Sequence, residues 1–227
     1  MKHNIVEATH RTENAVRKYY TWRASNYDAG ASFEVEHHAE AVRLAGIQES
    51  QQVLDVACGT GRGTIGLAEA VGSSGKVEAL DLTEAMLEKA RVKIESLGLS
   101  DRVHFQQGNT KELPYADASF DVLYNGYMFD LIPINDFLPI LKEFYRVLRT
   151  NGKLMLVNMS KPGTRKTFYE RVYGRGLAVM PCRPVLMSPF VQGAGFGDIH
   201  RLYRPSHGFL ISRLWGTEIV SARKASV

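Results

Sequence analysis

The chain has 227 residues, of which 44% are hydrophobic and 23% charged, and its formal net charge at pH 7 is +4. This length allows one sizeable core and is short for two full domains. No apolar stretch approaches the roughly 20 residues that a membrane-spanning helix requires, and the first residues, Met1 to Tyr20, lack the apolar centre of a secretory signal. We therefore expect a single cytoplasmic domain.

The first predicted segment is helical and covers residues of about 10 to 48. It is rich in aromatic side chains, namely Tyr19, Tyr20, Trp22, Tyr27 and Phe33. We expect this part of the chain to pack as a lid over the domain that follows.

Short apolar runs then alternate with amphipathic segments. The runs predicted to form buried strands are Gln52–Val56, Lys76–Leu80, Arg102–Gln106, Phe120–Tyr124 and Lys153–Asn158. Three helices are predicted between these strands, and the first is Thr64–Val71. The second is capped by Thr83 and ends at Gly98, and its apolar stripe is Leu87, Ala90, Ile94 and Leu97. The third is terminated by Asn151-Gly152, and its inner face is Phe137, Ile140, Leu141, Phe144, Val147 and Leu148. This alternation predicts a parallel sheet covered by helices on both faces.

The end of the chain has a different pattern. A segment rich in Arg, Gly and Pro (161–189) leads to a short helix near Pro189–Ala194 and to two strands, around Ile199–Tyr203 and Leu214–Ala222. The connection Arg204–Arg213 is too short for a helical crossover, so these two strands should pair antiparallel.

The seven histidines and two cysteines of the chain show no metal-ligand spacing. Cys58 and Cys182 form neither a disulfide framework nor a zinc pair, and Cys58 is predicted to be a packing residue. His37 and His38 point in different directions on a helix. We expect no metal site; the two histidines either supply a base or lie on an exposed helix face, and the exposed face is the favoured interpretation.

The most informative segment is the glycine-rich turn after the first predicted strand, Val53–Gly61. Gly59 and Gly61 remove side chains there and let a ligand approach the backbone closely. The following helix directs its unpaired N–H groups to the same place, which in an open α/β sheet is the expected binding crevice.

Two carboxylates indicate what this turn binds. Asp55 precedes Gly59 by four residues; it would repel a pyrophosphate and suits a ligand with an ammonium group. Asp81, twenty residues beyond Gly61, can accept hydrogen bonds from ribose hydroxyls, or it caps the helix at Thr83. The dinucleotide pattern GxGxxG fails because its third glycine position holds Thr64. A ribose and a cationic amino acid without phosphates describe S-adenosylmethionine.

Four motifs, in order and at proper spacing, carry a resemblance to a known family. They are VLDVACGTGRGT, ALDLTEAMLEKAR, LPYADASFDVLYNGYMFDLI and LRTNGKLMLVNMS. With these motifs the chain resembles the class I S-adenosylmethionine-dependent methyltransferases, within the group of ubiquinone/menaquinone-biosynthesis methyltransferases. The resemblance is good from roughly Tyr19 to Ser160 and loose in the rest of the chain. The resemblance implies a Rossmann-like α/β fold: a doubly wound seven-stranded sheet, mostly parallel with an antiparallel last strand, and helices on both faces.

We accordingly divide the single domain into four parts. These are an N-terminal helical lid (1–48), a cofactor-binding core (49–160), a substrate-cap insert (161–189), and a final helix and strands that complete the sheet (190–227).

The resemblance also implies which residues bind the cofactor. Asp55 would lie near its ammonium group, and Asp81 would bind the ribose. Asn109 would accept a hydrogen bond from the adenine amino group, at a position where the family usually has an acid. The complete set is Tyr27, Asp55, Ala57, Gly59, Thr60, Gly61, Asp81, Leu82, Met86, Gly108, Asn109, Thr110, Asn125 and Gly126.

The acceptor is less closely defined. No Asp-Pro-Pro-Tyr motif follows the fourth strand, which disfavours methylation of nucleic-acid amines, so we expect no nucleic-acid partner. Tyr127, Met128 and Phe129 suit an apolar acceptor or pack in the core. We predict a methyltransferase that acts on a small or lipid-like acceptor, such as a quinone precursor or phospholipid amine, and we assign no catalytic base. The alternatives are a non-catalytic partner protein that binds S-adenosylmethionine and a nicotinamide-dependent oxidoreductase.

The insert carries a cluster of basic residues. Between Lys161 and Pro184 there are six of them and one acid, Glu170; the six are Lys161, Arg165, Lys166, Arg171, Arg175 and Arg183. Such a cluster either contacts an anionic membrane surface or forms a solvated helix face. Peripheral membrane contact through residues 161–184 is therefore one of two hypotheses.

Overall fold

A computed structural model of the chain describes residues 7, 12–30, 34–177, 181–206 and 216–225. Its helices are α1 (Glu13–Arg23), α2 (Tyr27–Gly30), α3 (Glu34–Ala45), α4 (Arg62–Ala70), α5 (Glu84–Ser96), α6 (Phe137–Val147), α7 (Phe168–Tyr173) and α8 (Ser188–Gly193), with short 3-10 turns at Ser100–Arg102 and Ile134–Asp136. Its strands are β1 (Gln52–Val56), β2 (Lys76–Asp81), β3 (Val103–Gln107), β4 (Phe120–Gly126), β5 (Leu148–Ser160), β6 (Phe196–Pro205) and β7 (Gly216–Lys224).

The seven strands form one sheet in the order β3-β2-β1-β4-β5-β7-β6. Strands β1 to β5 run parallel to one another, and β7 runs antiparallel to both β5 and β6. The predicted fold class is confirmed, including the antiparallel pairing of the last two strands. The order reverses at β1, which lies between β2 and β4, and ligands of open α/β sheets bind at such a reversal.

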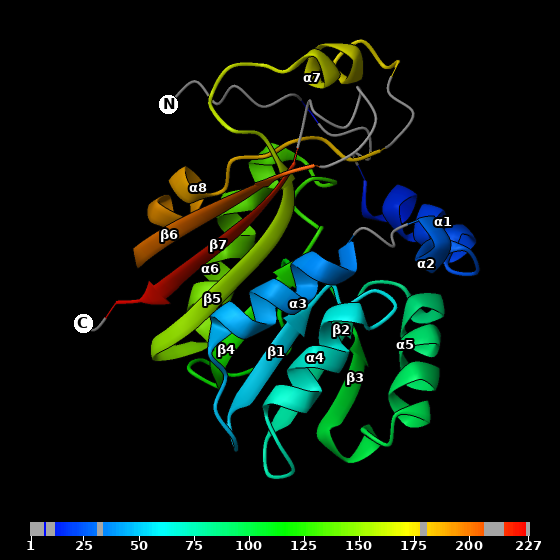
Figure 1. Cartoon of the computed structure of the whole chain (residues 1–227), viewed down its shortest axis with the longest axis vertical. Coiled ribbons are helices and arrows are strands. Elements are labelled where there is room, and N and C mark those ends of the chain that lie inside the picture. Colours follow the sequence, from blue (N-terminus) through cyan, green and yellow to red (C-terminus); the bar gives the residue numbers. More distant parts are fainter. Residues whose placement is uncertain (1–6, 8–11, 31–33, 178–180, 207–215, 226–227) are drawn as a thin grey trace.

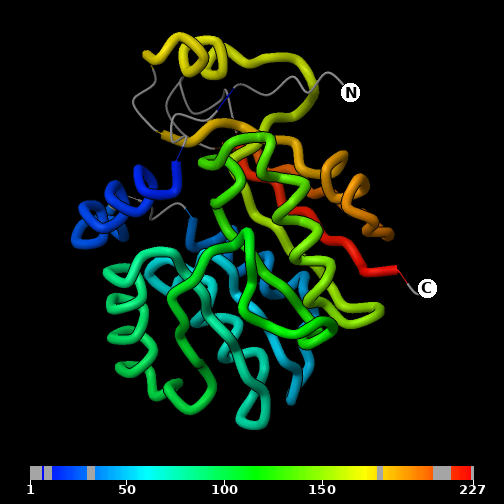
Figure 2. Tube along the Cα trace, turned by 180° about the vertical axis from the view of Figure 1, so that it is seen from behind, coloured from blue at the N-terminus to red at the C-terminus, as the bar shows by residue number. Residues whose placement is uncertain are grey.

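Helices cover both faces of the sheet. Helices α3, α4 and α5 lie on one face, in front in Figure 1, and their apolar residues pack on Val53, Val77 and Met155. Helices α6 and α8 lie on the other face, which Figure 2 shows from behind. All six residues that predicted the inner face of α6 are buried: Phe137, Ile140, Leu141, Phe144, Val147 and Leu148.

The predicted helical segment 10–48 contains three helices, α1, α2 and α3. Residues 10, 11 and 31–33, with the predicted aromatic Phe33, lie outside the described residues. Two expectations are corrected. Leu97 is 53% exposed because α5 ends at Ser96, and Asn151 (φ 63°) turns within β5, which begins directly after α6. The predicted strand start, Leu214, is outside the described residues as well.

Candidate functional site

The glycine-rich turn after β1 adopts left-handed backbone conformations at alternate residues. Ala57, Gly59 and Gly61 have φ values of 57°, 55° and 83°. Of these three residues, Ala57 carries the backbone strain, because an alanine in the left-handed region is strained by about 1–3 kcal/mol. Such strain concentrates at ligand sites. The turn brings the backbone of Gly59 beside the end of β2, where its N–H donates to Asp81.

Asp81 uses both carboxylate oxygens on backbone N–H groups. Its Oδ2 accepts from Gly59 N at 2.9 Å and its Oδ1 from Thr83 N at 2.8 Å. Burial raises the pKa of Asp81 to about 6, although the N–H donors of Thr83 and Gly59 oppose the rise. Asp81 therefore ties the turn to the start of α5, as the capping alternative requires, and it also lines the cavity described below.

Asp55 is almost completely buried at the end of β1. The Thr64 hydroxyl donates to its Oδ2 at 2.6 Å. Burial raises the pKa of this carboxyl to about 7, and the charge of nearby Asp81 adds to the rise. Two acids with raised pKa values thus stand at neighbouring strand ends, where a bound cation would stabilise their ionised forms.

Two adjoining cavities open at these strand ends. The larger, of about 120 Å³, has a largely apolar wall, whose residues are Val16, Tyr20, Tyr27, Ala57, Gly59, Asp81, Leu82, Thr83, Met86, Asn109, Thr110, Gly126, Tyr127, Met128, Leu131 and Ile132. The smaller, of about 30 Å³, is polar, and its residues are Tyr27, Glu34, His38, Asp55, Ala57, Cys58, Gly59, Thr60, Arg62, Gly63, Tyr124 and Gly126. Both share Tyr27, Ala57, Gly59 and Gly126, so the cavities meet at these four residues.

Most of the residues predicted to bind a cofactor line one cavity or both. They are Tyr27, Asp55, Ala57, Gly59, Thr60, Asp81, Leu82, Met86, Asn109, Thr110 and Gly126. Asn109 is already engaged: its Oδ1 accepts from Lys111 N at 2.9 Å and its Nδ2 donates to Glu13 on α1 at 2.7 Å. Its oxygen keeps one further lone pair for a ligand.

Three predicted residues, Gly61, Gly108 and Asn125, line neither cavity. A Cβ on Gly61 would lie 3.0 Å from Ala90 Cβ, and one on Gly108 would lie 2.7 Å from Leu80 Cδ1. Asn125 is fully buried and donates to Val56 O at 2.7 Å. These residues are small or buried because the chain packs closely beneath the site, and they support the loops that line it.

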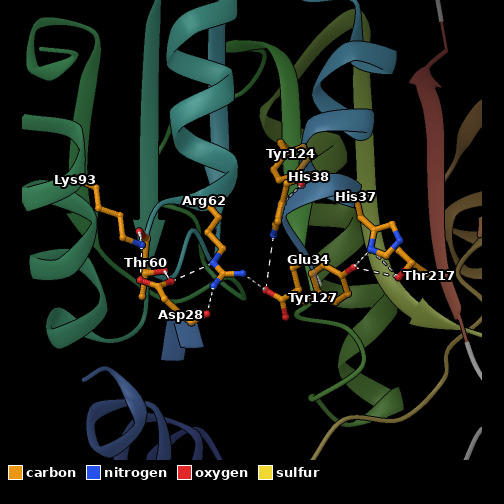
Figure 3. A network of polar contacts seen from close by, with 10 residues as sticks. All are labelled: Asp28, Glu34, His37, His38, Thr60, Arg62, Lys93, Tyr124, Tyr127 and Thr217. Atoms are coloured by element: carbon orange, nitrogen blue, oxygen red, sulfur yellow. Dashed lines mark hydrogen bonds and ion pairs between the residues drawn. The ribbon is translucent and has the colours of Figure 1, made fainter. Parts of the chain in front are cut away.

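A group of polar contacts around Asp28, called the latch below, joins the N-terminal helices to the glycine-rich turn (Figure 3). The site prediction does not include it. Asp28 of α2 accepts from Thr60 Oγ1 at 2.6 Å and from Arg62 Nε at 3.1 Å, and it pairs with Lys93 Nζ at 2.6 Å. Burial opposes ionisation of Asp28, but these donors outweigh it and lower its pKa. The site prediction includes Tyr27, the residue next to Asp28, whereas Arg62 and Lys93 follow no local pattern.

His37 and His38 do not form an exposed helix face, so the favoured interpretation of this pair is wrong. His38 Nδ1 lies 2.5 Å from the Tyr124 hydroxyl, and His37 Nδ1 lies 2.9 Å from the Tyr127 hydroxyl (Figure 3). Both histidines are half-buried because α3 packs across the sheet beside α4. Burial lowers the pKa of His37.

The basic cluster of the insert is also smaller than predicted. Lys161 and Arg183 are completely buried. Lys161 pairs with Glu170 at 2.5 Å, and Arg183 donates to the carbonyls of Asp130 and Ile132 in the loop after β4. These two cations hold the insert on the domain and cannot contact a membrane surface.

The raised pKa of Asp55 predicts a pH dependence of stability. The folded chain holds this proton more tightly than the unfolded chain does, so the free energy of unfolding falls as pH rises from about 4 to about 7 and is constant above. The contribution is about 1.4 kcal/mol per pH unit within this window. Urea unfolding at pH 5 and pH 7 should show a smaller decrease in Asp55→Asn; equal decreases in both proteins would contradict the assignment.

Comparison with known proteins identifies the family of the chain. A model of the ubiE/COQ5 methyltransferase family matches residues 9–187. The chain belongs to this family. Among curated relatives, demethylmenaquinone methyltransferases of Bacillus cytotoxicus and Lactococcus lactis are 38% identical over 123 residues and 36% identical over 155 residues. These matches cover 54% and 66% of this chain but 51% and 60% of the relatives, so the chain spans about half the length of several curated relatives it matches.

Solved structures share the fold at low sequence identity. The cyclase SpnF superposes with a TM-score of 0.75 at 18% identity, over 98% of this chain and all of that one. A SAM-dependent methyltransferase from Aquifex aeolicus gives a TM-score of 0.63 at 22% identity and covers 90% and 98% of the two chains. Since one neighbour is named a cyclase, the fold alone does not define the reaction, and family membership rests on the sequence match.

Metal ligation and membrane spanning are not indicated by the described residues. No group of three or more His, Cys, Asp or Glu side chains in the described ranges is placed to hold a metal ion. No helix in the part of the chain that the structure describes is long and apolar enough to cross a membrane.

Proposed function

We propose that this chain transfers a methyl group from S-adenosylmethionine to a quinone precursor. The observation that carries the proposal is the pair of buried acids, Asp55 and Asp81, at the ends of adjacent strands, each facing one of two joined cavities. Membership of the ubiE/COQ5 methyltransferase family supports it.

The residues present fit this cofactor. We assign the adenosine to the larger cavity, where Asp81 would bind the ribose hydroxyls while Leu82 and Met86 flank the adenine. The methionine end would extend into the smaller cavity, where an ammonium group would supply the positive charge that buried Asp55 favours. A dinucleotide fits less well, because Asp55 would repel a pyrophosphate.

The bound cofactor supplies an already activated methyl group on a positively charged sulfur. The residues of the chain therefore have to align the acceptor and exclude water. We place the reacting centre where the two cavities meet, at Tyr27, Ala57, Gly59 and Gly126. A Cβ on Gly126 would lie 2.7 Å from His38 Cε1, so a glycine keeps this junction unobstructed.

The proposed acceptor follows from the apolar end of the larger cavity and from the names of the relatives. Met128, Leu131 and Ile132 of the loop after β4 line that end. The curated relatives are named demethylmenaquinone methyltransferases. A reduced naphthoquinone ring matches such a wall in polarity.

Calorimetry and a transfer assay test this function. S-adenosylhomocysteine should bind with micromolar affinity and NADH should not, and radiolabelled methyl groups should pass to 1,4-naphthohydroquinone kept reduced. Absence of S-adenosylhomocysteine binding by folded protein would contradict the proposal. Binding without transfer to quinols, phenols, amines or thiols would favour a non-catalytic binding partner.

The exposed part of the insert suits peripheral contact with an anionic membrane, and we include this contact in the proposal. Helix α7 stands beyond the carboxyl ends of the strands (Figure 1). Phe168, on this helix, is 62% exposed, and Leu177, just after it, is 70% exposed. Four exposed cations surround them in sequence: Arg165, Lys166, Arg171 and Arg175. Each basic residue near an anionic bilayer contributes about 1 kcal/mol.

Vesicle sedimentation measures this contact. Vesicles with phosphatidylglycerol should bind the chain, and changing the four exposed cations to Gln should weaken binding at least 100-fold, while vesicles of phosphatidylcholine alone should bind neither protein. The matched control changes Lys76, Lys89, Lys111 and Arg149, which lie elsewhere, to Gln. Equal binding by the two quadruple variants would contradict the assignment.

A further inference from the structure

Tyr127, the first residue after β4, has a strained backbone. Its φ is 54°, in the left-handed region that a bulky side chain rarely adopts, and its N–H donates to Val157 O of β5 at 2.6 Å. Strain of this kind persists only where the surrounding structure imposes it, and it concentrates at ligand sites. The other non-glycine residues with positive φ in the described ranges are Ser50, Ala57, Ala118, Asn151 and Asp198. Of these, only Ala57 lines a cavity of the proposed site, as Tyr127 does.

The Tyr127 side chain is anchored at its hydroxyl group (Figure 3). The hydroxyl oxygen lies 2.9 Å from His37 Nδ1 on α3 and 3.1 Å from Thr217 Oγ1 on β7, and these two partner atoms lie 3.2 Å apart. Burial raises the pKa of Tyr127 well above its usual range and lowers the pKa of His37. At neutral pH the hydroxyl therefore keeps its proton, and the imidazole is mostly neutral and can accept it. The His38 ring packs on the Tyr127 ring, with centroids 5.6 Å apart and planes at 66°.

The residue held in this way belongs to the wall of the larger cavity. Tyr127 stands in the chain between Gly126, where the two cavities meet, and Met128, at the apolar end. The sequence left open whether this stretch contacts an acceptor or packs in the core. Phe129 is fully buried in the core, whereas Tyr127 and Met128 line the cavity, so the stretch does both.

We propose that Tyr127 is the platform on which the aromatic ring of the acceptor stacks, and that it thereby selects flat, fused acceptors such as a naphthohydroquinone. The inference rests on the proposed function. Aromatic rings attract one another in offset-stacked arrangements, and a ring with a fixed orientation presents a defined surface for such contact. A fixed platform also holds the acceptor carbon in line with the methyl group. His37 and Thr217 line neither cavity and act through Tyr127, so they are positioning residues.

Acceptor selectivity tests the platform. The measured quantity is kcat/KM for 1,4-naphthohydroquinone divided by kcat/KM for 1,4-benzenediol, because comparing this ratio between variants cancels the intrinsic reactivity of each acceptor. Tyr127→Leu should lower the ratio about tenfold, whereas Tyr127→Phe, which keeps the ring, should lower it less than about threefold. The affinity for S-adenosylhomocysteine should change far less than the ratio does in Tyr127→Leu. Tyr145→Leu is the matched control, since this half-buried tyrosine packs on Phe196 and lines neither cavity, and its ratio should equal that of wild type.

A double-variant cycle tests the anchor. His37→Ala and Tyr127→Phe should each lower kcat about tenfold, because each frees the ring from its fixed orientation. The two changes together should lower kcat no further, since they remove the same interaction. His37→Asn, whose amide oxygen can accept the hydroxyl proton in place of Nδ1, should recover most of the rate. Additive losses, or no recovery in His37→Asn, would contradict the positioning role of His37.

Nuclear magnetic resonance detects the stacking in the unaltered chain. With ring-labelled tyrosine, the Tyr127 signals are those that disappear in Tyr127→Phe. Addition of 1,4-dimethoxynaphthalene, which cannot react, to the complex with S-adenosylhomocysteine should shift these signals upfield, as a ring stacked on the face of Tyr127 requires. This measurement decides the matter if Tyr127→Leu does not fold.

Three outcomes count against the platform. An unchanged selectivity ratio in folded Tyr127→Leu would overturn the assignment while the proposed function stands. The same holds if saturating 1,4-dimethoxynaphthalene leaves the Tyr127 signals of the wild-type chain in place. If the wild-type chain binds S-adenosylhomocysteine but methylates no acceptor, both proposals fail.

Discussion

Asp81→Ala should weaken the binding of S-adenosylhomocysteine at least 100-fold. The carboxylate holds Gly59 N and Thr83 N at 2.9 and 2.8 Å, so its removal frees the glycine-rich turn from the start of α5. The same oxygens are those assigned to the ribose, and each charge-assisted hydrogen bond contributes about 1.5–3 kcal/mol. Titration calorimetry measures the loss directly.

Two further variants define the role of the charge. Asp81→Asn keeps the shape but presents an NH₂ group to one of the two backbone N–H donors, so it should recover only part of the affinity. Glu78→Gln, on the same strand and paired with His104 at the surface, should bind as wild type. Wild-type affinity in Asp81→Ala would remove the central argument for the cofactor site.

Lys161→Met should lower the free energy of unfolding by about 3–5 kcal/mol, because it leaves the Glu170 carboxylate buried without its cation. The ammonium and carboxylate lie 2.5 Å apart, and both side chains are 0% exposed. Urea unfolding measures the loss.

A double variant and a surface control show whether burial is the cause. Lys161→Met with Glu170→Gln should recover at least half of the loss, since the amide oxygen can still accept from Thr167 N, as Glu170 does at 2.7 Å. Lys111→Met removes a pair of similar length, 2.8 Å, whose lysine is 51% exposed, and should cost less than about 1 kcal/mol. Equal costs for both single variants would contradict the reasoning.

The sheet and its covering helices were predictable because their signal is local. The bounds of β1 match the prediction at both ends, since a short apolar run between turns defines a buried strand. The break of the N-terminal segment into α1, α2 and α3 was not predictable in this way. Asp28, at that break, is held by Thr60, Arg62 and Lys93, which are 32 or more residues away in the chain.

The residues that line the two cavities were predictable to a similar extent, and for a similar reason. Asp55, Gly59 and Asp81 lie at strand ends that the sequence motifs mark, and all three line a cavity. Charge burial was not visible in the sequence. Lys161 and Arg183 count as part of a basic cluster until their buried partners are known, which are Glu170, nine residues away, and the carbonyl of Asp130, 53 residues away.

The latch at Asp28 has a consequence for turnover. One carboxylate joins the N-terminal helices to Thr60 of the glycine-rich turn, to Arg62 at the start of α4 and to Lys93 of α5; Thr60 and Arg62 line the smaller cavity. We expect spent cofactor to leave, and fresh cofactor to arrive, when these contacts part, because Tyr27, the residue next to Asp28, lines both cavities. Steady-state turnover would then be paced by how often this junction opens, so loosening it should speed product release even where the chemical step is unchanged.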